Sequence, residues 1–269
     1  MSVTVDVGCY QGFVAAQRGK HPGPVDRGRS FGSVAELYER YRLGYPGEVV
    51  DEVLRYAGRP VRFAVEVGAG TGKATGLFAS RGVAVTAVEP DADMARVLAR
   101  TMRGLPVEPV VVTFEQFSTG RRFDLVYAAA SWHWTDPETR WTRAVELLVP
   151  GGVIALFGSP GELSDPDLGA AVEEIQKRVL PDDDGAAGLH PWSIEETADV
   201  DGLTDRAQLD LPASVTTTAT EYVGRLATVS AYLTLEPEVR AEALRQVRAV
   251  LPERLEIDST VQLSLARRV

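Results

Sequence analysis

The sequence predicts an α/β protein built around a doubly wound parallel sheet. In its most informative stretch, 63–75, a short apolar strand runs into a turn with the glycines Gly68, Gly70 and Gly72, and the turn opens a helix. Strand and helix patterns then alternate as far as residue 157. Such alternation implies right-handed crossovers, and therefore parallel strands with helices on both faces. A chain of 269 residues with 45% apolar content can bury this arrangement as one large core.

The first half of the chain supplies the parallel strands and their crossover helices. We expect a helical start at 30–57, broken at 44–47, whose second helix covers 48–56. Strands are predicted at 63–67, 84–88, 107–112, 123–128 and 153–157, and helices at 73–80, 92–102 and 141–148. The Pro-Gly-Gly triplet at 150–152 is expected to form a turn before the fifth strand.

The second half departs from plain alternation. An insertion at 158–203 is expected to hold one helix, 167–180, and then a loop too rich in Asp, Gly and Pro to build its own core. Thr218 and Glu221 have the capping-box spacing of a helix start, and Pro237 suits the first turn of a further helix that reaches residue 250. Alternating apolar residues at 260–267 predict a final strand at the edge of the sheet.

The glycine turn distinguishes between three classes of nucleotide-binding loop. A phosphate-binding loop of the NTPase type needs a further glycine and a hydroxyl where this chain has Val67 and Ala74. A dinucleotide-binding turn needs a third glycine where this chain has Lys73. The remaining pattern, three glycines at alternate positions, indicates a third class of nucleotide or nucleoside ligand.

Two acidic residues flank the turn in a way that suits a nucleoside. Glu66 lies one position before the end of the first strand, and Glu89 closes the second strand. A carboxylate at the carboxyl end of the second strand can accept hydrogen bonds from both hydroxyls of a ribose, and it would repel a 2′-phosphate. The pattern therefore predicts an unphosphorylated adenosine. The alternative for Glu89 is an ordinary exposed acid at a strand end.

Six segments, taken in order, carry a resemblance to a known family: FGSVAELYERYRLGYP, VEVGAGTGKAT, AVEPDADM, TFEQF, FDLVYAAASWHWTDP and LLVPGGVIAL. Their order and spacing resemble those of class I S-adenosylmethionine-dependent methyltransferases, over 31–269. Within that class, the chain is similar to the small-molecule enzymes of the type 11 or trans-aconitate-methyltransferase-like group. The resemblance implies S-adenosyl-L-methionine as cofactor and S-adenosyl-L-homocysteine as product.

The resemblance also implies an architecture. It implies a mostly parallel, seven-stranded, Rossmann-like sheet with an antiparallel last strand, in which 207–211 pairs with 260–267. A flexible tail, 1–29, would precede a single domain, 30–269. Within that domain, 30–60 would form a helical lid, and 159–204 together with 218–251 would form the helices of a substrate cap.

The resemblance places the cofactor along the carboxyl edge of the sheet. Met94 would lie against the adenine face, or else fill the core, and Glu115 or its neighbour would meet the adenine edge, or else cap a helix. Glu66 would engage the amides of the turn or, through water, the cofactor's amino group. Arg42 would hold a carboxylate of cofactor or substrate, unless its helix is a plain surface helix. The full predicted cofactor set is Glu66, Gly68, Gly70, Thr71, Gly72, Glu89, Pro90, Met94, Phe114, Glu115, Ala129, Ser131, Tyr38 and Arg42.

Aromatic residues predict the wall of a substrate pocket. Trp132 and Trp134, after the fourth strand, offer large apolar surfaces that exclude water, and Tyr45 of the lid is assigned to the same pocket. His133 is the best-placed base for an acceptor that must lose a proton, or else a structural histidine bonded to a backbone carbonyl. Because methyl transfer is an in-line displacement, alignment alone can supply on the order of 7–11 kcal/mol.

Composition excludes several other partners. The net charge of −10 would repel phosphate backbones and anionic lipid, so we expect neither a nucleic-acid nor a membrane partner. His21 and His190 lack cysteine or carboxylate neighbours at ligand spacing, so no metal site is expected. The single cysteine, Cys9, cannot form an internal disulfide, and no secretory or membrane-spanning segment is recognised. We therefore expect a cytoplasmic protein, monomeric or homodimeric.

The sequence thus predicts a methyltransferase that acts on a small organic metabolite, with secondary metabolism as the expected setting and with oxygen, nitrogen and carbon acceptors all open. An alternative keeps the fold and the cofactor but not the transfer: a protein that binds S-adenosylmethionine or S-adenosylhomocysteine and catalyses a non-methylating reaction, or serves as a scaffold. A third hypothesis, an NAD-dependent dehydrogenase, is opposed by Lys73 at the position of the third glycine.

Overall fold

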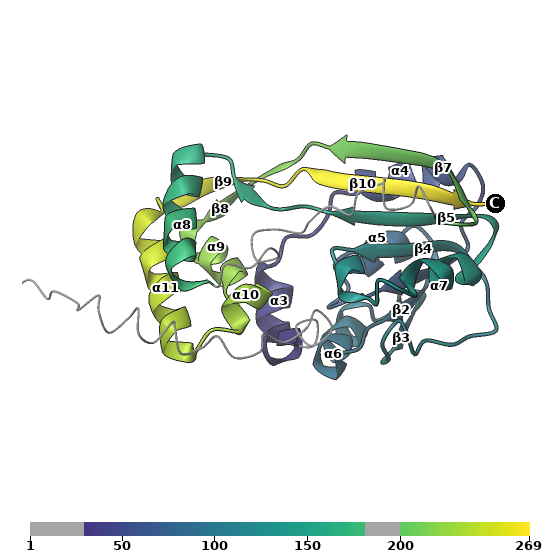
Figure 1. Cartoon of the computed structure of the whole chain (residues 1–269), viewed down its shortest axis with the longest axis horizontal. Helices are drawn as coiled ribbons and strands as arrows, with labels where there is room; N and C mark the ends of the chain where they lie inside the picture. The colour runs from purple at the N-terminus through teal and green to yellow at the C-terminus, as the bar shows by residue number, and fades with distance from the viewer. Residues whose placement is uncertain (1–29, 181–199) are drawn as a thin grey trace, which may run out of the picture.

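A seven-stranded sheet of order β3-β2-β1-β4-β5-β10-β7 forms the larger part of the molecule (Figure 1), a computed structural model that describes residues 30–180 and 200–269. Its strands are β1 (Phe63–Val67), β2 (Ala84–Val88), β3 (Val107–Val110), β4 (Phe123–Ala129), β5 (Leu148–Gly158), β7 (Leu203–Leu211) and β10 (Val261–Arg268). The strands β1 to β5 pair in parallel, and β10 runs antiparallel to both β5 and β7. The predicted fold class is confirmed.

Helices cover both faces of this sheet because the central strands are apolar on both sides. The helices α4 (Glu48–Ala57), α5 (Thr75–Ala79) and α6 (Ala92–Thr101) contribute Val53, Phe78 and Leu98 to the core on one face. On the other face, α7 (Arg140–Leu147) packs Ala144 against Ile154 of β5. Buried side chains of both faces alternate along each strand, as the pleat of a sheet requires.

Two details of the predicted sheet were wrong. The triplet at 150–152 is not a turn before β5 but part of it: Gly151 has a φ of +73°, and the pairing shifts register between Phe123 and Leu125, so the triplet is absorbed as a bulge. The last strand is not an edge strand, because β10 lies between β5 and β7. Its small residues Ser264 and Ala266 are buried as well as its leucines, which the alternating pattern did not reveal.

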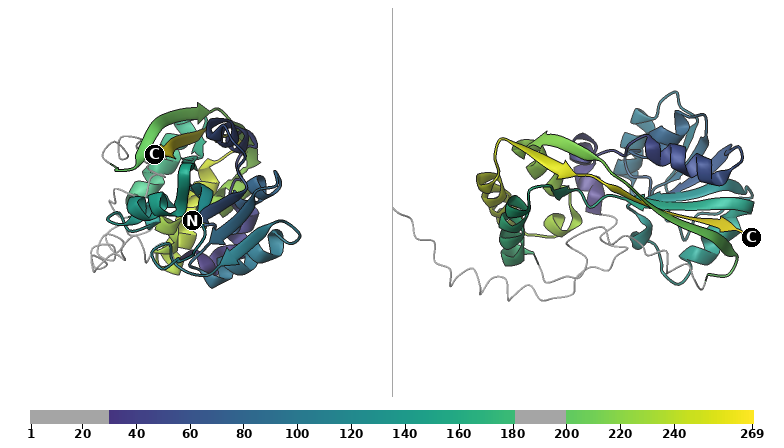
Figure 2. Two further views of the ribbon diagram at one scale, coloured as in Figure 1. Left: turned by 90° about the vertical axis from the view of Figure 1, so that its right-hand side faces the viewer. Right: turned by 90° about the horizontal axis from the view of Figure 1, so that it is seen from above.

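A second unit, which we call the cap, covers the carboxyl edge of the sheet (Figure 1, left; Figure 2, right-hand view). It contains α8 (Pro166–Val179), α9 (Ala219–Leu226), α10 (Ser230–Leu233), α11 (Pro237–Val250) and a small sheet of order β6-β9-β8, formed by Glu162–Leu163, Arg254–Asp258 and Ser214–Thr218. Helices α8, α9 and α11 and the capping box at Thr218 were predicted; the small sheet was missed. The cap has its own apolar core, which includes Ile175, Tyr232 and Ile257.

A short helical segment joins the sheet to the cap. The 3-10 turn η1 (Ser30–Val34) and helix α3 (Ala35–Tyr41) lie between the two units in Figure 1. Ala35 packs against Met94 and Val97 of α6. On the cap side, a Cβ on Gly224 would approach the Tyr41 ring to 2.8 Å, so this glycine lets α9 come close to α3. Residues 1–29, with Cys9 and His21, and the loop with His190 lie outside the described residues.

Candidate ligand-binding site

The glycine turn binds three strand ends together. Gly68, Gly70 and Gly72 have φ angles of +68°, +58° and +95°, a region that residues with a side chain rarely adopt. The Gly68 amide donates to the Val88 carbonyl at the end of β2, over 2.9 Å. A Cβ on Gly68 would lie 2.6 Å from that of Ser131, which follows β4. The turn is therefore held at the carboxyl ends of β1, β2 and β4, where open α/β sheets bind ligands.

Glu89 supports the turn from the end of β2. The Gly70 amide donates to its Oε2 at 2.7 Å, and the Asp91 amide donates to its Oε1 at 2.9 Å. The side chain is 6% exposed, and this burial raises the pKa of Glu89 to about 7 in spite of the two amides, which act in the opposite direction. Each oxygen keeps a second lone pair, so the carboxylate can still accept two further hydrogen bonds.

Glu66 has different partners from those expected. Its Oε2 accepts hydrogen bonds from the Thr75 hydroxyl at 2.5 Å and from the Tyr127 hydroxyl at 2.9 Å, and these replace the predicted contacts with amides of the turn. Burial raises the pKa of Glu66 to about 8, against the opposing effect of both hydroxyls. Glu66 thus ties the end of β1 to α5 and β4, beneath the turn.

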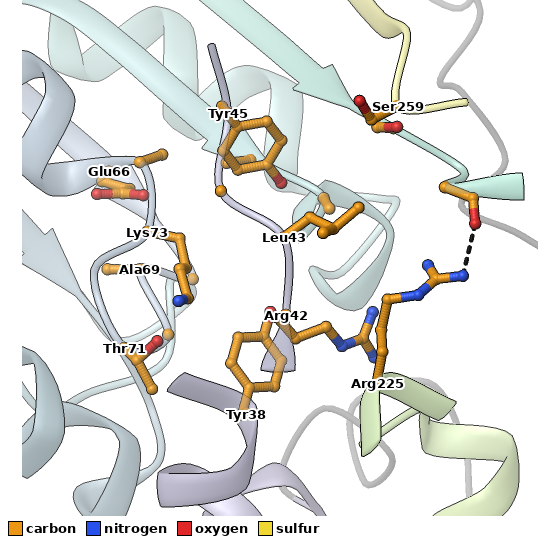
Figure 3. Close-up of a pocket in the computed structure, with 18 residues that line it drawn as sticks. Tyr38, Arg42, Leu43, Tyr45, Glu66, Ala69, Thr71, Lys73, Arg225 and Ser259 are labelled. Carbon is orange, nitrogen blue, oxygen red and sulfur yellow. Dashed lines mark hydrogen bonds between the residues drawn. The ribbon is translucent and has the colours of Figure 1, made fainter. Parts of the chain in front are cut away.

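A pocket opens in front of these strand ends, between the sheet, the cap and the segment 30–60, for which we keep the expected name lid (Figure 3). About 690 Å³ in and around it is free of protein atoms, and part of this space is open solvent. The predicted residues that line it are Tyr38, Arg42, Tyr45, Glu66, Gly68, Gly70, Thr71 and Ala129. The Thr71 hydroxyl is buried and has no hydrogen-bond partner among the described residues.

The lid side chains are fixed in position by the cap and the sheet. Arg42 donates from Nε to the Thr228 hydroxyl at 2.9 Å and from Nη2 to the Thr228 carbonyl at 2.8 Å. Its guanidinium carbon lies 5.1 Å from the centre of the Tyr38 ring, a cation–π distance. The Tyr45 ring meets Phe157 of β5 edge to face at 5.0 Å. Burial raises the pKa of both Tyr38 and Tyr45.

Other predicted cofactor residues lie beside the pocket rather than in its lining, among them Glu89, Gly72 and Pro90. Met94 is 3% exposed and packs under the turn, 3.5 Å from where a Cβ on Gly70 would lie. Phe114 is buried in the core below β4, and Glu115 accepts a hydrogen bond from the Asp136 amide at 2.9 Å. Ser131 donates to the Val67 carbonyl and so joins β4 to β1.

The aromatic segment after β4 also lies outside the lining. It forms the 3-10 turn η2 (Trp132–Trp134), in which Trp132 is 4% exposed and contacts Phe114 and Trp141. Trp134 packs edge to face on Phe31, at 6.0 Å between ring centres. The exposed His133 ring lies 4.3 Å from the Trp134 ring.

The pocket includes several residues that the sequence analysis did not single out as site residues: Leu43, Gly44, Ala69, Lys73, Ala74, Ala130, Ser159, Gly161, Arg225 and Ser259. Lys73 pairs with Glu39 of the lid, 3.5 Å away. Arg225 is 9% exposed. The sequence contains one indication of this: Arg225 lies three residues after Tyr222 and next to Leu226, on the apolar face of a predicted helix. Because arginine is rarely buried without a partner, its place on that face could have pointed to a functional role.

The described residues form neither a metal-binding cluster nor a membrane-spanning helix. Across 30–180 and 200–269, no three His, Cys, Asp or Glu side chains gather in a way that could hold a metal ion. Within the same ranges, every helix is too short or too polar to cross a bilayer.

Comparison with known proteins identifies relatives of this chain. A family model described as "Methyltransferase domain" matches residues 64–152, from β1 into β5. An uncharacterized methyltransferase of Mycobacterium tuberculosis is 32% identical over 237 residues, which cover 84% of this chain and 87% of the relative. A counterpart in Mycobacterium bovis matches equally well.

Solved structures support the fold. A type II methyltransferase of Anaeromyxobacter dehalogenans aligns with a TM-score of 0.61 at 20% identity, covering 84% of this chain and 98% of that protein. A phosphoethanolamine N-methyltransferase of Haemonchus contortus, solved with phosphomonomethylethanolamine and S-adenosylhomocysteine, aligns with a TM-score of 0.54 at 14% identity. That alignment covers 91% of this chain and 59% of the nematode protein.

Proposed function

Because the chain belongs to the class I S-adenosylmethionine-dependent methyltransferases, we propose that it methylates an oxygen, nitrogen or carbon atom of a small organic acceptor. The observation that carries this proposal is the junction of the glycine turn with Glu89, at the mouth of a pocket that the lid and the cap cover. A pocket that is covered by two other parts of the chain suits a small acceptor better than a macromolecular one.

The residues at this junction fit an adenosyl cofactor. The unused lone pairs of Glu89 suit the two hydroxyls of a ribose, and the unpaired Thr71 hydroxyl is available to a polar group of the same ligand. Gly68 and Gly70 have no side chains, so the ligand can approach the backbone of the turn directly. We therefore assign the predicted cofactor set to S-adenosyl-L-methionine, with Met94, Phe114 and Glu115 on the adenine side.

The cofactor supplies an electrophilic methyl group on a sulfonium, which a nucleophile of the acceptor takes by in-line displacement. The contribution of this chain is alignment and the exclusion of water. Tyr38, Leu43 and Tyr45 line the pocket from the lid, and their apolar surfaces would displace solvent around the reacting groups. A role for His133 as base stays a prediction, since its ring lies outside the pocket lining.

The domain roles follow from the same arrangement. We propose that 30–60 acts as the lid over the cofactor and that the described parts of 159–204 and 218–251 form the cap over the acceptor. Arg42 and Thr228 join the two parts across the pocket.

The proposal can be tested by calorimetric titration with S-adenosylhomocysteine, NAD and ATP. We expect binding of S-adenosylhomocysteine only, and a loss of at least about tenfold in Glu89→Ala, since two hydrogen bonds to a charged group are removed. Glu89→Gln keeps the shape of the side chain and should also bind weakly. Glu108→Ala, which removes an exposed carboxylate from β3, is the matched control and should bind as the wild type does.

Two outcomes would contradict this function. A preference for NAD, or no binding of S-adenosylhomocysteine, would reject the cofactor assignment. Binding without methyl release from labelled S-adenosylmethionine, across a broad panel of hydroxyl, amine and carbon acceptors, would favour the non-methylating alternative instead.

A further inference from the structure

Arg225 is a buried cation at the cap end of the pocket. It projects from α9, lines the pocket and is 9% exposed (Figure 3). Its Nη2 donates to the Gly161 carbonyl at 2.5 Å, and its guanidinium carbon lies 5.1 Å from the centre of the Tyr222 ring. Its Nε is buried and has no hydrogen-bond partner among the described residues. A guanidinium has five N–H donors, so beside its bonds to Gly161 and to the Tyr222 side chain it keeps donors, Nε among them, for a ligand.

The charge of Arg225 is not balanced by the described part of the protein. No Asp or Glu oxygen of the described residues lies within 4.0 Å of its guanidinium, or of that of Arg42. Arg42, which lines the same pocket, adds a second positive charge nearby. Burial and this like charge both lower the pKa of Arg225. A buried cation without a counter-ion is costly, and an anion that enters the pocket would remove the cost.

The guanidinium of Arg225 packs closely on the Gly161 backbone, and further polar groups line the pocket around it. Gly161 has a φ of +63° and no side chain; a Cβ there would lie 2.5 Å from Nη1 of Arg225. The Ser159 hydroxyl, also in the pocket lining, is buried without a partner among the described residues. Ser259 lines the pocket beside it and is 7% exposed. We call Arg225, Ser159, Gly161 and Ser259 the Arg225 subsite.

We propose that the Arg225 subsite binds a carboxylate of the acceptor. The enzyme would then methylate small carboxylic acids, and the bound carboxylate would determine which atom of the acceptor faces the methyl group. The proposal rests on the proposed function and deepens it by naming the substrate class. The Arg225 side chain would donate to the carboxylate oxygens, and the Ser159 hydroxyl would add a neutral donor.

A carboxylate suits the subsite better than a phosphoryl group. Arg42 has Nε and Nη2 committed to Thr228, which leaves Arg225 as the main donor and matches a single negative charge. A phosphoryl group carries up to two charges and usually gathers several cations.

The test uses acetate as the probe, because acetate is small enough to enter the subsite whatever the rest of the acceptor looks like. Thermal unfolding of the full chain is followed with increasing sodium acetate, at constant ionic strength, with and without S-adenosylhomocysteine. We expect a saturable rise in Tm of about 2 °C or more for the wild type. Acetamide, which has the same shape without the charge, should have no effect.

Three variants separate a ligand site from a structural arginine. Arg225→Met replaces the guanidinium by a shorter, unbranched apolar side chain and should lose the acetate effect, while its affinity for S-adenosylhomocysteine stays within about twofold of the wild type. Arg225→Lys, which keeps the charge, should retain a weaker effect and covers the case in which the Met variant does not fold. Arg178→Met removes an exposed cation from α8 and should respond to acetate as the wild type does.

Each other result overturns the proposal. An acetate effect that is absent, or equal in Arg225→Met, removes the subsite. A larger effect of inorganic phosphate than of acetate assigns a phosphoryl group instead. A tenfold loss of S-adenosylhomocysteine affinity in Arg225→Met assigns Arg225 to the cofactor's own carboxylate. Because acetate is also titrated without S-adenosylhomocysteine, a failure of the proposed function is seen separately.

Discussion

Two buried carboxylates dominate the chemistry at the scale of single residues. The pKa of Glu89 is raised to about 7 and that of Glu66 to about 8, in both cases mainly by burial. In the folded protein, each group therefore binds its proton more tightly than in the unfolded chain. Their combined contribution to stability is full at low pH and decreases as pH rises from the ordinary carboxyl range through these values. The ligand-free protein is therefore less stable toward unfolding when Glu89 is ionised than when it is protonated.

Glu89 should give cofactor binding a pH dependence. Ribose hydroxyls donate better to the ionised carboxylate, so the affinity for S-adenosylhomocysteine should rise between about pH 6 and pH 8, approaching tenfold per unit below the pKa. Calorimetry at several pH values measures this directly. In Glu89→Gln the rise should disappear; an equal rise in that variant would assign the effect to another group, such as Glu66.

At the scale of elements, the lid depends on a contact that spans the sequence. The side chain of Arg42 is held by both the hydroxyl and the carbonyl of Thr228, at the end of α9. The close approach of α9 to α3 at Gly224 supports the same junction. The lid is therefore positioned by the cap as much as by the sheet, and the state of one should affect ligand binding at the other.

Thr228→Val tests this junction. The substitution keeps the volume and removes the oxygen that accepts from Arg42 Nε, so Arg42 should become mobile and the affinity for S-adenosylhomocysteine should fall by about three- to tenfold. Thr234→Val is the matched control, because both hydroxyls also donate to the carbonyl three residues earlier. Equal affinity in Thr228→Val and wild type would show that the lid is held without this contact.

At the scale of the whole molecule, the sheet and the cap are joined by four chain connections. The chain crosses between them after β5, between α8 and β7, between β7 and β8, and between β9 and β10. The last crossing is tight: Ser259, directly after β9, donates its amide to the Ala213 carbonyl, and β10 begins two residues later. Such short connections, together with the lid, should make the sheet and the cap unfold as one cooperative unit.

Ile257→Ala tests this cooperativity. Ile257 is 1% exposed in the cap core, and its truncation should cost about 2–5 kcal/mol. Of the four tryptophans, those at 132, 134 and 141 lie in the larger unit, so with Trp192 replaced by Phe in every variant the fluorescence reports on the sheet. In Ile257→Ala, the urea unfolding transitions followed by fluorescence and by far-UV circular dichroism should move to lower urea by the same amount.

Val250→Ala is the control. It lies at a 41% exposed position of α11 and should change the free energy of unfolding by less than about 0.5 kcal/mol. A fluorescence transition that does not move in Ile257→Ala would show that the cap unfolds independently.

Much of the fold could be predicted because it is encoded locally. The strands and helices from Phe63 to Phe157 follow from apolar periodicity, and the turn after β1 follows from glycines that adopt positive φ angles. The capping box at Thr218 is likewise a contact between residues three apart. The small sheet of the cap was missed because its strands are short and meet only through pairing between distant segments, such as Leu163 with Ile257.

The same distinction between local and long-range contacts applies to the residues of the site. The glycine turn and Glu89 were found from the sequence because their chemistry depends on neighbours in the chain and on the order of the strands. Long-range packing decided that Trp132 lies in the core, that Glu66 bonds to Thr75 and Tyr127, and that Arg225 reaches the pocket. Local patterns specify backbone conformation; which side chains share a cavity depends on how segments up to about two hundred residues apart pack together.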